Sequence, residues 1–244
     1  MYRSIRELHI PRGAVSVIGS GGKTTFLRCL SEHLHGRVIL TTSTRIFPFS
    51  GMPLIDPSIF RSADPGPDEG PNHTPACDPE AVCQEILSAF EHSRVICFGC
   101  AHLSGKLGDP SPFIPFEKLT ALADHVLIEA DGSAGHPLKA HRPWEPVIPD
   151  CSSLTICLVG ASGIGALPEK ACHCPDLFMA LADMSGNDPV TNEHIAQVLK
   201  KEDLADCYLI NQVDTLRDPK AALRLCELIE KPAYAGSLRS GQFL

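Results

Sequence analysis

Short apolar runs alternate with amphipathic segments along most of this chain of 244 residues. The runs are rich in Val, Ile and Leu and end in Gly, Pro or polar residues, which is typical of buried strands. Between them, apolar residues recur at helical spacing, as Phe26, Leu27 and Leu30 do before Gly36. The predicted strands cover 14–18, 37–42, 94–99, 125–131, 154–160, 206–211 and 233–236, and the predicted helices cover 23–35, 79–92, 116–123, 176–184, 191–200 and 219–230.

This alternation predicts a three-layer α/β fold, in which helices cover both faces of a mostly parallel sheet of about seven strands. A chain of this length can form a single domain over residues 1–244. The segment 61–80 consists mainly of Pro, Gly, Asp, Asn and Ser, so we expect a mobile surface insertion there. In such a sheet, ligand-binding residues gather at the carboxyl ends of the strands.

A glycine-rich motif follows the first predicted strand and runs directly into the first predicted helix. Its glycines let backbone N–H groups turn toward a polyanion at the positive end of the helix. The lysine would reach the outer phosphates, and the next hydroxyl would ligate magnesium. Because Val17 stands where the longer motif has glycine, this is the short G-x-x-G-K-T-T form, for which an ordinary turn is the alternative. The motif indicates a P-loop NTPase-like fold with the nucleotide-binding residues Gly19, Ser20, Gly21, Gly22, Lys23, Thr24 and Thr25.

Two carboxylates end the apolar run 125–131. Glu129 and Asp131 are two positions apart, so on a strand they would face the same side. Either could hold magnesium with Thr24, while the other orients the attacking water. Lys23, Glu129 and Asp131 are therefore the predicted catalytic residues, and a strand that simply ends in solvated acids is the alternative.

A candidate base-reading motif ends another apolar strand. Asn211-Gln212-Val213-Asp214 is close to the Asn-Lys-x-Asp of guanine readers, in which the aspartate accepts hydrogen bonds from guanine. Gln212 replaces the lysine whose stem covers the base. Since a polar mismatch discriminates more strongly than a missing methylene, GTP is favoured over ATP.

Three further residues are candidates for binding a substrate or partner. Lys139 and Glu145 lie in the segment after the acid-bearing strand, where this architecture engages substrates. Arg45 follows the second strand and could offer its charge to a phosphate or an acidic ligand. An ordinary solvated surface is the alternative for each.

Composition narrows the class of protein. The formal net charge of −8 argues against nucleic acid as a partner. No apolar run approaches a membrane span, and eleven cysteines without an apolar leader in a chain of this size favour the reducing cytoplasm. Cys97 and Cys100, like Cys172 and Cys174, fit small buried thiols better than a zinc site.

Several stretches taken together resemble the selenium-dependent hydroxylase accessory proteins of the YqeC type. These stretches are the glycine motif, 41–46, 128–133, 137–139 and 145–149. The resemblance implies a P-loop NTPase that helps to mature molybdenum hydroxylases. It also implies a molybdenum hydroxylase or its cofactor-loading machinery as partner, and the molybdenum cofactor as a client ligand.

Three functions remain open from the sequence. The first is a magnesium-dependent nucleoside triphosphatase acting as such an accessory factor. The second is a ligase or transferase that activates a carboxylate, because the short loop also resembles that of the Mur-type amide ligases. The third is a non-hydrolysing carrier of the molybdenum cofactor.

Overall fold

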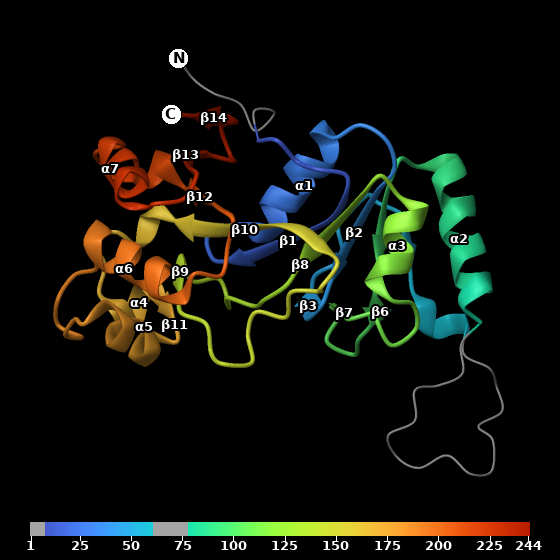
Figure 1. Ribbon diagram of the computed structural model, residues 1–244, viewed down its shortest axis with the longest axis horizontal. Helices are drawn as coiled ribbons and strands as arrows, with labels where there is room; N and C mark the ends of the chain where they lie inside the picture. The colour runs from blue at the N-terminus through green and yellow to red at the C-terminus, as the bar shows by residue number, and fades with distance from the viewer. Residues whose placement is uncertain (1–7, 61–77) are drawn as a thin grey trace, which may run out of the picture.

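A parallel sheet runs through the centre of the molecule (Figure 1). The computed structural model describes residues 8–60 and 78–244, so most of the predicted insertion at 61–80 lies outside the described residues. Within them the sheet has nine strands in the order β14-β13-β12-β10-β1-β8-β2-β5-β4, all parallel except the pair β13 and β14. The strands are β1 (Gly13–Gly19), β2 (Val38–Thr42), β4 (Leu54–Ile55), β5 (Val95–Phe98), β8 (His125–Glu129), β10 (Ser152–Gly160), β12 (Cys207–Asn211), β13 (Ala233–Ser237) and β14 (Gln242–Phe243).

All seven predicted strands are present, and the expected number is too low by two edge strands. Those two, β4 and β14, have two residues each, too few to produce a hydrophobic period. The predicted strand 125–131 ends at Glu129, so Asp131 lies in the loop that follows. The sheet class is confirmed, because the long apolar runs fill strands that are buried on both faces.

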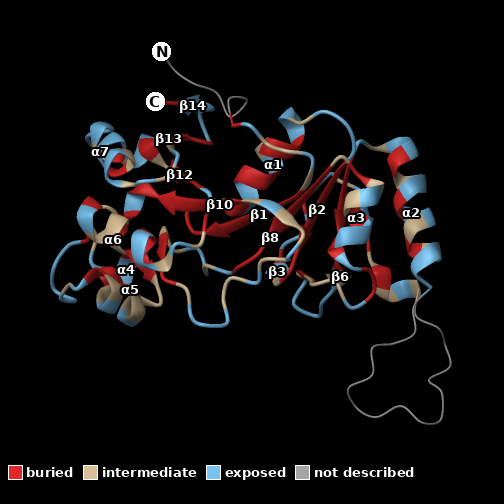
Figure 2. Cartoon of the chain, in the orientation of Figure 1, coloured by how far each residue is buried: buried red, intermediate tan, exposed pale blue. Residues whose placement is uncertain are grey.

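Helices cover both faces of the sheet. Alternate residues of each strand point to opposite faces, so Val17 packs with Phe26 of α1 while its neighbour Ile18 packs in the core under α5 and α6. Helices α2 and α3 cover the other end of that second face (Figure 1), and the inward sides of the helices are buried (Figure 2). The helices are α1 (Lys23–His33), α2 (Pro79–His92), α3 (Phe116–Leu122), α4 (Pro168–Ala171), α5 (Pro175–Ala182), α6 (Asn192–Glu202) and α7 (Lys220–Leu228).

Short elements follow the carboxyl ends of the central strands, where the sequence predicts only loops. They form an antiparallel sheet of three strands and a parallel pair, each strand only two residues long. These strands follow β2, β5, β8 and β10 in the chain and build the rim of the edge that carries the predicted site. They are β3 (Arg45–Ile46), β6 (Cys100–Ala101), β7 (Leu107–Gly108), β9 (Leu138–Lys139) and β11 (Cys172–His173), and the 3₁₀ turns are η2 (Pro57–Phe60), η3 (Ala161–Gly163) and η4 (Val213–Thr215).

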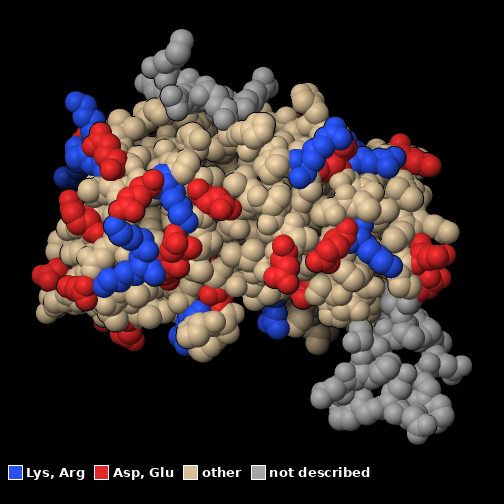
Figure 3. Space-filling model, in the orientation of Figure 1, with Lys and Arg blue, Asp and Glu red and all other residues tan. Residues whose placement is uncertain are grey.

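The surface carries interspersed charges on the face drawn in Figure 3. The described residues also include exposed ion pairs, such as Lys200 with Glu230 and Lys201 with Asp183. Exposed pairs of this kind contribute little to stability, roughly 0–1 kcal/mol each. In the part of the chain that the structure describes, no helix is long and apolar enough to cross a membrane.

Candidate functional site

The loop between β1 and α1 depends on its glycines. We call residues 19–22 the glycine loop. Gly19 and Gly21 have φ angles of 85° and 92°, which side chains with a Cβ rarely adopt. A Cβ on Gly21 would lie 2.4 Å from Gly160 Cα, and one on Gly19 would lie 2.3 Å from the Leu158 carbonyl oxygen. The glycine loop therefore packs directly on the backbone of β10, and both positions require glycine.

Asn211, at the end of β12, links the glycine loop to Leu238, the residue that follows β13. Its Nδ2 donates to the Gly21 carbonyl over 2.6 Å, and its Oδ1 accepts from the Leu238 amide over 2.9 Å. The side chain is buried. Both polar atoms of the amide of Asn211, a predicted nucleotide-binding residue, are therefore hydrogen-bonded within the protein.

The rest of the expected base-reading motif lies at the same edge. Gln212 has a positive φ of 66°, and its Oε1 accepts from Ser162 Oγ over 2.6 Å. Asp214 follows in η4 and is exposed. Its carboxylate is thus open to a ligand, in contrast to the Asn211 amide.

Lys23 begins α1 and is buried among oxygen atoms. Its Nζ donates to the Gly19 carbonyl over 2.7 Å and to Ser133 Oγ over 3.4 Å. It also lies 3.0 Å from Asp131 Oδ1, an ion pair without hydrogen-bond geometry, and 3.9 Å from Glu129 Oε1. Although Asp131 lies beyond the end of β8, both predicted acids thus meet the predicted lysine.

Thr24 contacts the nearer of the two acids. Its Oγ1 donates to Glu129 Oε2 over 3.2 Å. Burial raises the pKa of Glu129, and this outweighs the opposing effect of the Lys23 charge. Two oxygen ligands suited to a hard cation therefore lie side by side at the amino end of α1.

Asp131 is fully buried and accepts from several donors. Its Oδ2 accepts from the Gly19 amide over 2.8 Å and from His141 Nε2 over 2.7 Å, and it lies 3.3 Å from Lys139 Nζ. Burial alone would raise the pKa of Asp131, but the hydrogen bond from His141 and the charges of Lys23 and Lys139 lower it to about 2. Asp131 is therefore an ionised anchor for the glycine loop.

Lys139, a candidate for binding a substrate or partner, is buried inside this network. Its Nζ lies 2.8 Å from Glu145 Oε2 and also donates to the Gly132 carbonyl. Its position on β9, paired with β11, brings it inward. A loop of mixed polarity does not reveal from sequence which of its charges will be buried.

Two residues of this network, His141 and Glu202, carried no signal in the sequence. His141 Nδ1 lies 2.9 Å from Glu202 Oε2, and the His141 backbone amide donates to Glu202 Oε1 over 2.6 Å. These contacts join residues 61 positions apart. No short-range spacing signals such a pair, so only the folded chain could reveal it.

The remaining predicted residues differ in exposure. Arg45 is exposed on β3, and Thr25 is exposed on the first turn of α1. Ser20 is buried in the glycine loop, and its Oγ has no hydrogen-bond partner among the described residues. Thr42, at the end of β2, donates to the Glu129 carbonyl over 2.7 Å and so fixes the end of β8.

The cysteines form no metal centre in the described ranges. No group of three or more His, Cys, Asp or Glu residues there could hold a metal ion. Burial raises the pKa of Cys97, and it raises that of Cys172 to about 12. Such thiols stay protonated and behave as small apolar side chains.

Comparison with known proteins identifies the family. The model of the YqeC protein family matches residues 15–176. The chain belongs to the YqeC family. It is also 33% identical over 187 residues to the uncharacterized protein YqeC of Escherichia coli (strain K12), an alignment that covers 72% of this chain and 61% of that relative.

The YqeC match covers most of the site but not all of it. Residues 15–176 include the glycine loop, both predicted acids and the segment from Lys139 to Glu145. Asn211, Asp214 and Glu202 lie beyond it. The residues of β12 and α6 that contribute to the site therefore lie outside the YqeC match.

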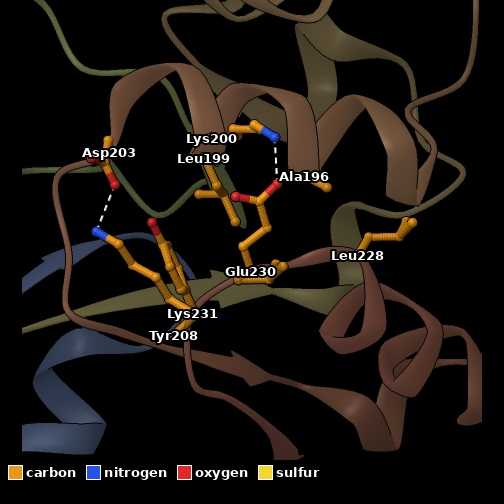
Figure 4. Close-up of a pocket in the computed structure, with 9 residues that line it drawn as sticks. Ala196, Leu199, Lys200, Asp203, Tyr208, Leu228, Glu230 and Lys231 are labelled. Carbon is orange, nitrogen blue, oxygen red and sulfur yellow. Dashed lines mark hydrogen bonds and ion pairs between the residues drawn. The ribbon is translucent and has the colours of Figure 1, made fainter.

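A cavity of about 220 Å³ lies between α6, the start of β12 and the segment that follows α7 (Figure 4). Tyr208 lines it from the start of β12, whereas Asn211, at the end of that strand, contacts the glycine loop. The ion pairs Lys200–Glu230 and Lys231–Asp203 border it. The cavity lining does not include the side chains that contact Asp131, although Leu199 and Tyr208 also line a small space beside His141 and Glu202.

Proposed function

We propose that this YqeC-family chain is a magnesium-dependent nucleoside triphosphatase that acts as an accessory factor for selenium-dependent molybdenum hydroxylases. The observation that carries the proposal is the contact of Thr24 with Glu129 directly beside Lys23 and the glycine loop. A lysine, a hydroxyl and a carboxylate at the start of a helix are the groups that phosphoryl transfer requires.

The triphosphate would bind at the glycine loop. Its anionic oxygens would meet backbone N–H groups and the positive end of α1. The Lys23 ammonium, 3% exposed, lies where it could exchange part of its contact with Asp131 for the outer phosphates. In a site with little water, that charge would stabilise negative charge developing on the transferred group.

Magnesium fits the groups present. Thr24 Oγ1 and Glu129 Oε2 are oxygen ligands of the kind this ion prefers, and nucleotide sites commonly supply only one or two protein ligands besides phosphates and water. When bound, the ion would neutralise phosphate charge. The raised pKa of Glu129 also fits this role, because its burial is unfavourable until a cation is near.

The contacts favour different roles for the two acids. Glu129 is the better candidate for the metal ligand, because it alone contacts Thr24. Asp131 is engaged by Gly19, His141 and two lysines. We assign Asp131 to holding Lys23 and the glycine loop in place.

The nucleotide and the partner are assigned from separate features. Asp214, exposed after β12, supports GTP over ATP. The resemblance to hydroxylase accessory proteins supports a molybdenum hydroxylase or its cofactor-loading machinery as partner, the molybdenum cofactor as client ligand, and work in the cytoplasm. Arg45, exposed on β3, would offer its charge to that partner.

The test is a phosphate-release assay with all four nucleoside triphosphates, with and without magnesium and a molybdenum hydroxylase. We expect magnesium-dependent release that falls on the order of 100-fold in Lys23→Ala. Lys118→Ala, at an exposed position of α3, is the matched control and should be unaffected. Nucleotide binding without phosphate release, even with the hydroxylase present, would refute the triphosphatase and favour the non-hydrolysing carrier. Release only with an added carboxylate and amine acceptor would favour the ligase.

A further inference from the structure

A buried chain of hydrogen bonds joins the glycine loop to the end of α6. It begins at the Gly19 amide and passes through Asp131 and His141 to Glu202, over distances of 2.8, 2.7 and 2.9 Å. The three side chains are 0%, 4% and 8% exposed. The glycine loop is thereby connected to a helix that does not belong to it.

His141 must donate to two carboxylates at once. A neutral imidazole has one donor and one acceptor nitrogen, so it cannot donate to both Asp131 and Glu202. Only the doubly protonated ring satisfies both contacts, and a buried cation between two anions is the arrangement that compensates its loss of hydration. The geometry therefore fixes both the ring and the Asp131 carboxylate.

Glu202 occupies a position that is unfavourable for a carboxylate. It is the last residue of α6, where the helix dipole disfavours negative charge. Its two oxygens accept from the backbone and the ring of the same residue, His141. These two hydrogen bonds compensate for the unfavourable location of the Glu202 charge, and they hold His141 at both its backbone and its ring.

We propose that His141 and Glu202 are positioning residues, which hold Asp131 in the orientation that fixes the Gly19 amide and Lys23. Asp131 contacts both groups, and Lys23 in turn contacts the Gly19 carbonyl. The start of the glycine loop is thus set from α6. The consequence for nucleotide binding rests on the proposed function, whereas the effect on the Gly19 amide does not.

The direct test is hydrogen exchange of the Gly19 amide, measured by NMR on the full chain. Because a misoriented Asp131 would weaken a strong hydrogen bond to a charged acceptor, exchange should rise at least about tenfold in His141→Ala and Glu202→Ala. The Ser20 amide, which donates to the Leu158 carbonyl, is the internal control and should change little. Lys200→Ala, on the exposed side of the same helix, controls for substitution in α6.

Glu202→Gln separates positioning from general stability. Its amide can still accept from the His141 backbone and can donate to Nδ1 of a neutral ring, whose Nε2–H still reaches Asp131. We expect Gly19 exchange within about threefold of wild type in this variant. If His141→Ala does not fold, Glu202→Ala and Glu202→Gln decide the question alone.

Nucleotide affinity gives the second measurement. If the proposed function holds, the dissociation constant should rise about tenfold in Glu202→Ala and change little in Glu202→Gln. A wild-type chain that binds no nucleotide would refute the proposed function, while the exchange experiment would still judge the positioning. Gly19 exchange that is unchanged in the folded Ala variants, or that rises equally at Ser20, would overturn the proposal.

Discussion

Thr24 Oγ1 donates to Glu129 Oε2 over 3.2 Å, although the two residues are 105 positions apart. The contact exists because β1 and β8 are neighbours in the sheet, with Val17 opposite Glu129. The helix that follows β1 therefore starts beside the carboxylate that ends β8. A hydroxyl and an acid from distant parts of the sequence are combined into one candidate metal site.

The Thr24 hydroxyl should set the magnesium requirement. Thr24→Ala removes an oxygen ligand and the hydrogen bond that orients Glu129, and changes of this kind cost roughly 10–100-fold in metal affinity. We expect the half-saturating magnesium concentration for phosphate release to rise by about tenfold or more. Titration of magnesium at saturating nucleotide measures it.

Two variants control this prediction. Thr24→Ser keeps the hydroxyl and should stay close to wild type. Thr25→Ala removes the same kind of side chain from the next, exposed position and should leave the magnesium requirement unchanged. Equal shifts in Thr24→Ala and Thr25→Ala would contradict a specific role for Thr24.

The glycine loop should tolerate no side chain at residue 21. Gly21→Ala combines a positive φ with a Cβ 2.4 Å from Gly160 Cα. Gly105→Ala shares the positive φ, 74°, but its Cβ meets nothing within 4 Å. The left-handed conformation costs an Ala about 1–2 kcal/mol, and overpacking adds about 1–3 kcal/mol. Chemical denaturation should show the larger loss of unfolding free energy for Gly21→Ala, and equal losses would refute the steric argument.

The two acids should have opposite effects on stability at pH 7. Burial raises the pKa of Glu129, so its ionised form lowers the unfolding free energy and Glu129→Gln should raise the melting temperature. Asp131→Asn instead leaves Lys139 and His141 facing a neutral group, which costs about 3–5 kcal/mol for a broken buried pair. Thermal unfolding of both variants measures the contrast. A melting temperature that falls in both variants would show that ionised Glu129 does not destabilise the folded chain.

Acid should weaken the fold through Asp131. Its pKa is lowered to about 2 in the folded chain, so its contribution is fully present above the unfolded value of about 3.9 and is lost as the pH falls through 2. The shift corresponds to about 2–3 kcal/mol. Denaturation between pH 5 and pH 2 should therefore show a steeper loss for wild type than for Asp131→Asn. Parallel curves would mean that Asp131 is not a strongly ionised anchor.

The sequence predicted the strands and helices better than the contacts between side chains. Long apolar runs mark the seven main strands, because a strand that is buried on both faces has apolar residues at nearly every position. The required glycines at 19 and 21 are also visible, since only glycine suits a loop pressed against β10. Two-residue strands such as β9 are too short to leave a periodic signal, and β9 carries Lys139 into the interior.

The pairing of charges could not be foreseen from spacing. Glu202 meets His141 only because α6 ends above the loop that follows β8, a relationship set by the packing of the second helical layer. Asn211 was predicted at the correct edge of the sheet. Its amide, however, is directed to the Gly21 carbonyl, a choice that depends on where the glycine loop lies in space.

Substitutions of Asp214 and of Asn211 should have different effects on the preference for GTP over ATP. Asp214 is exposed, so Asp214→Ala should weaken GTP about tenfold or more and leave ATP nearly unchanged, because a site that reads hydrogen-bond donors discriminates strongly. Asn211→Ala removes the bond to the Gly21 carbonyl and should weaken both nucleotides alike. Asp218→Ala, at an exposed carboxylate paired with Arg224, is the matched control and should affect neither. Dissociation constants for GTP and ATP across the three variants measure these effects. Equal losses for the two nucleotides in Asp214→Ala would show that Asp214 does not read guanine, since an acceptor for its N1 and N2 donors contributes nothing to adenine.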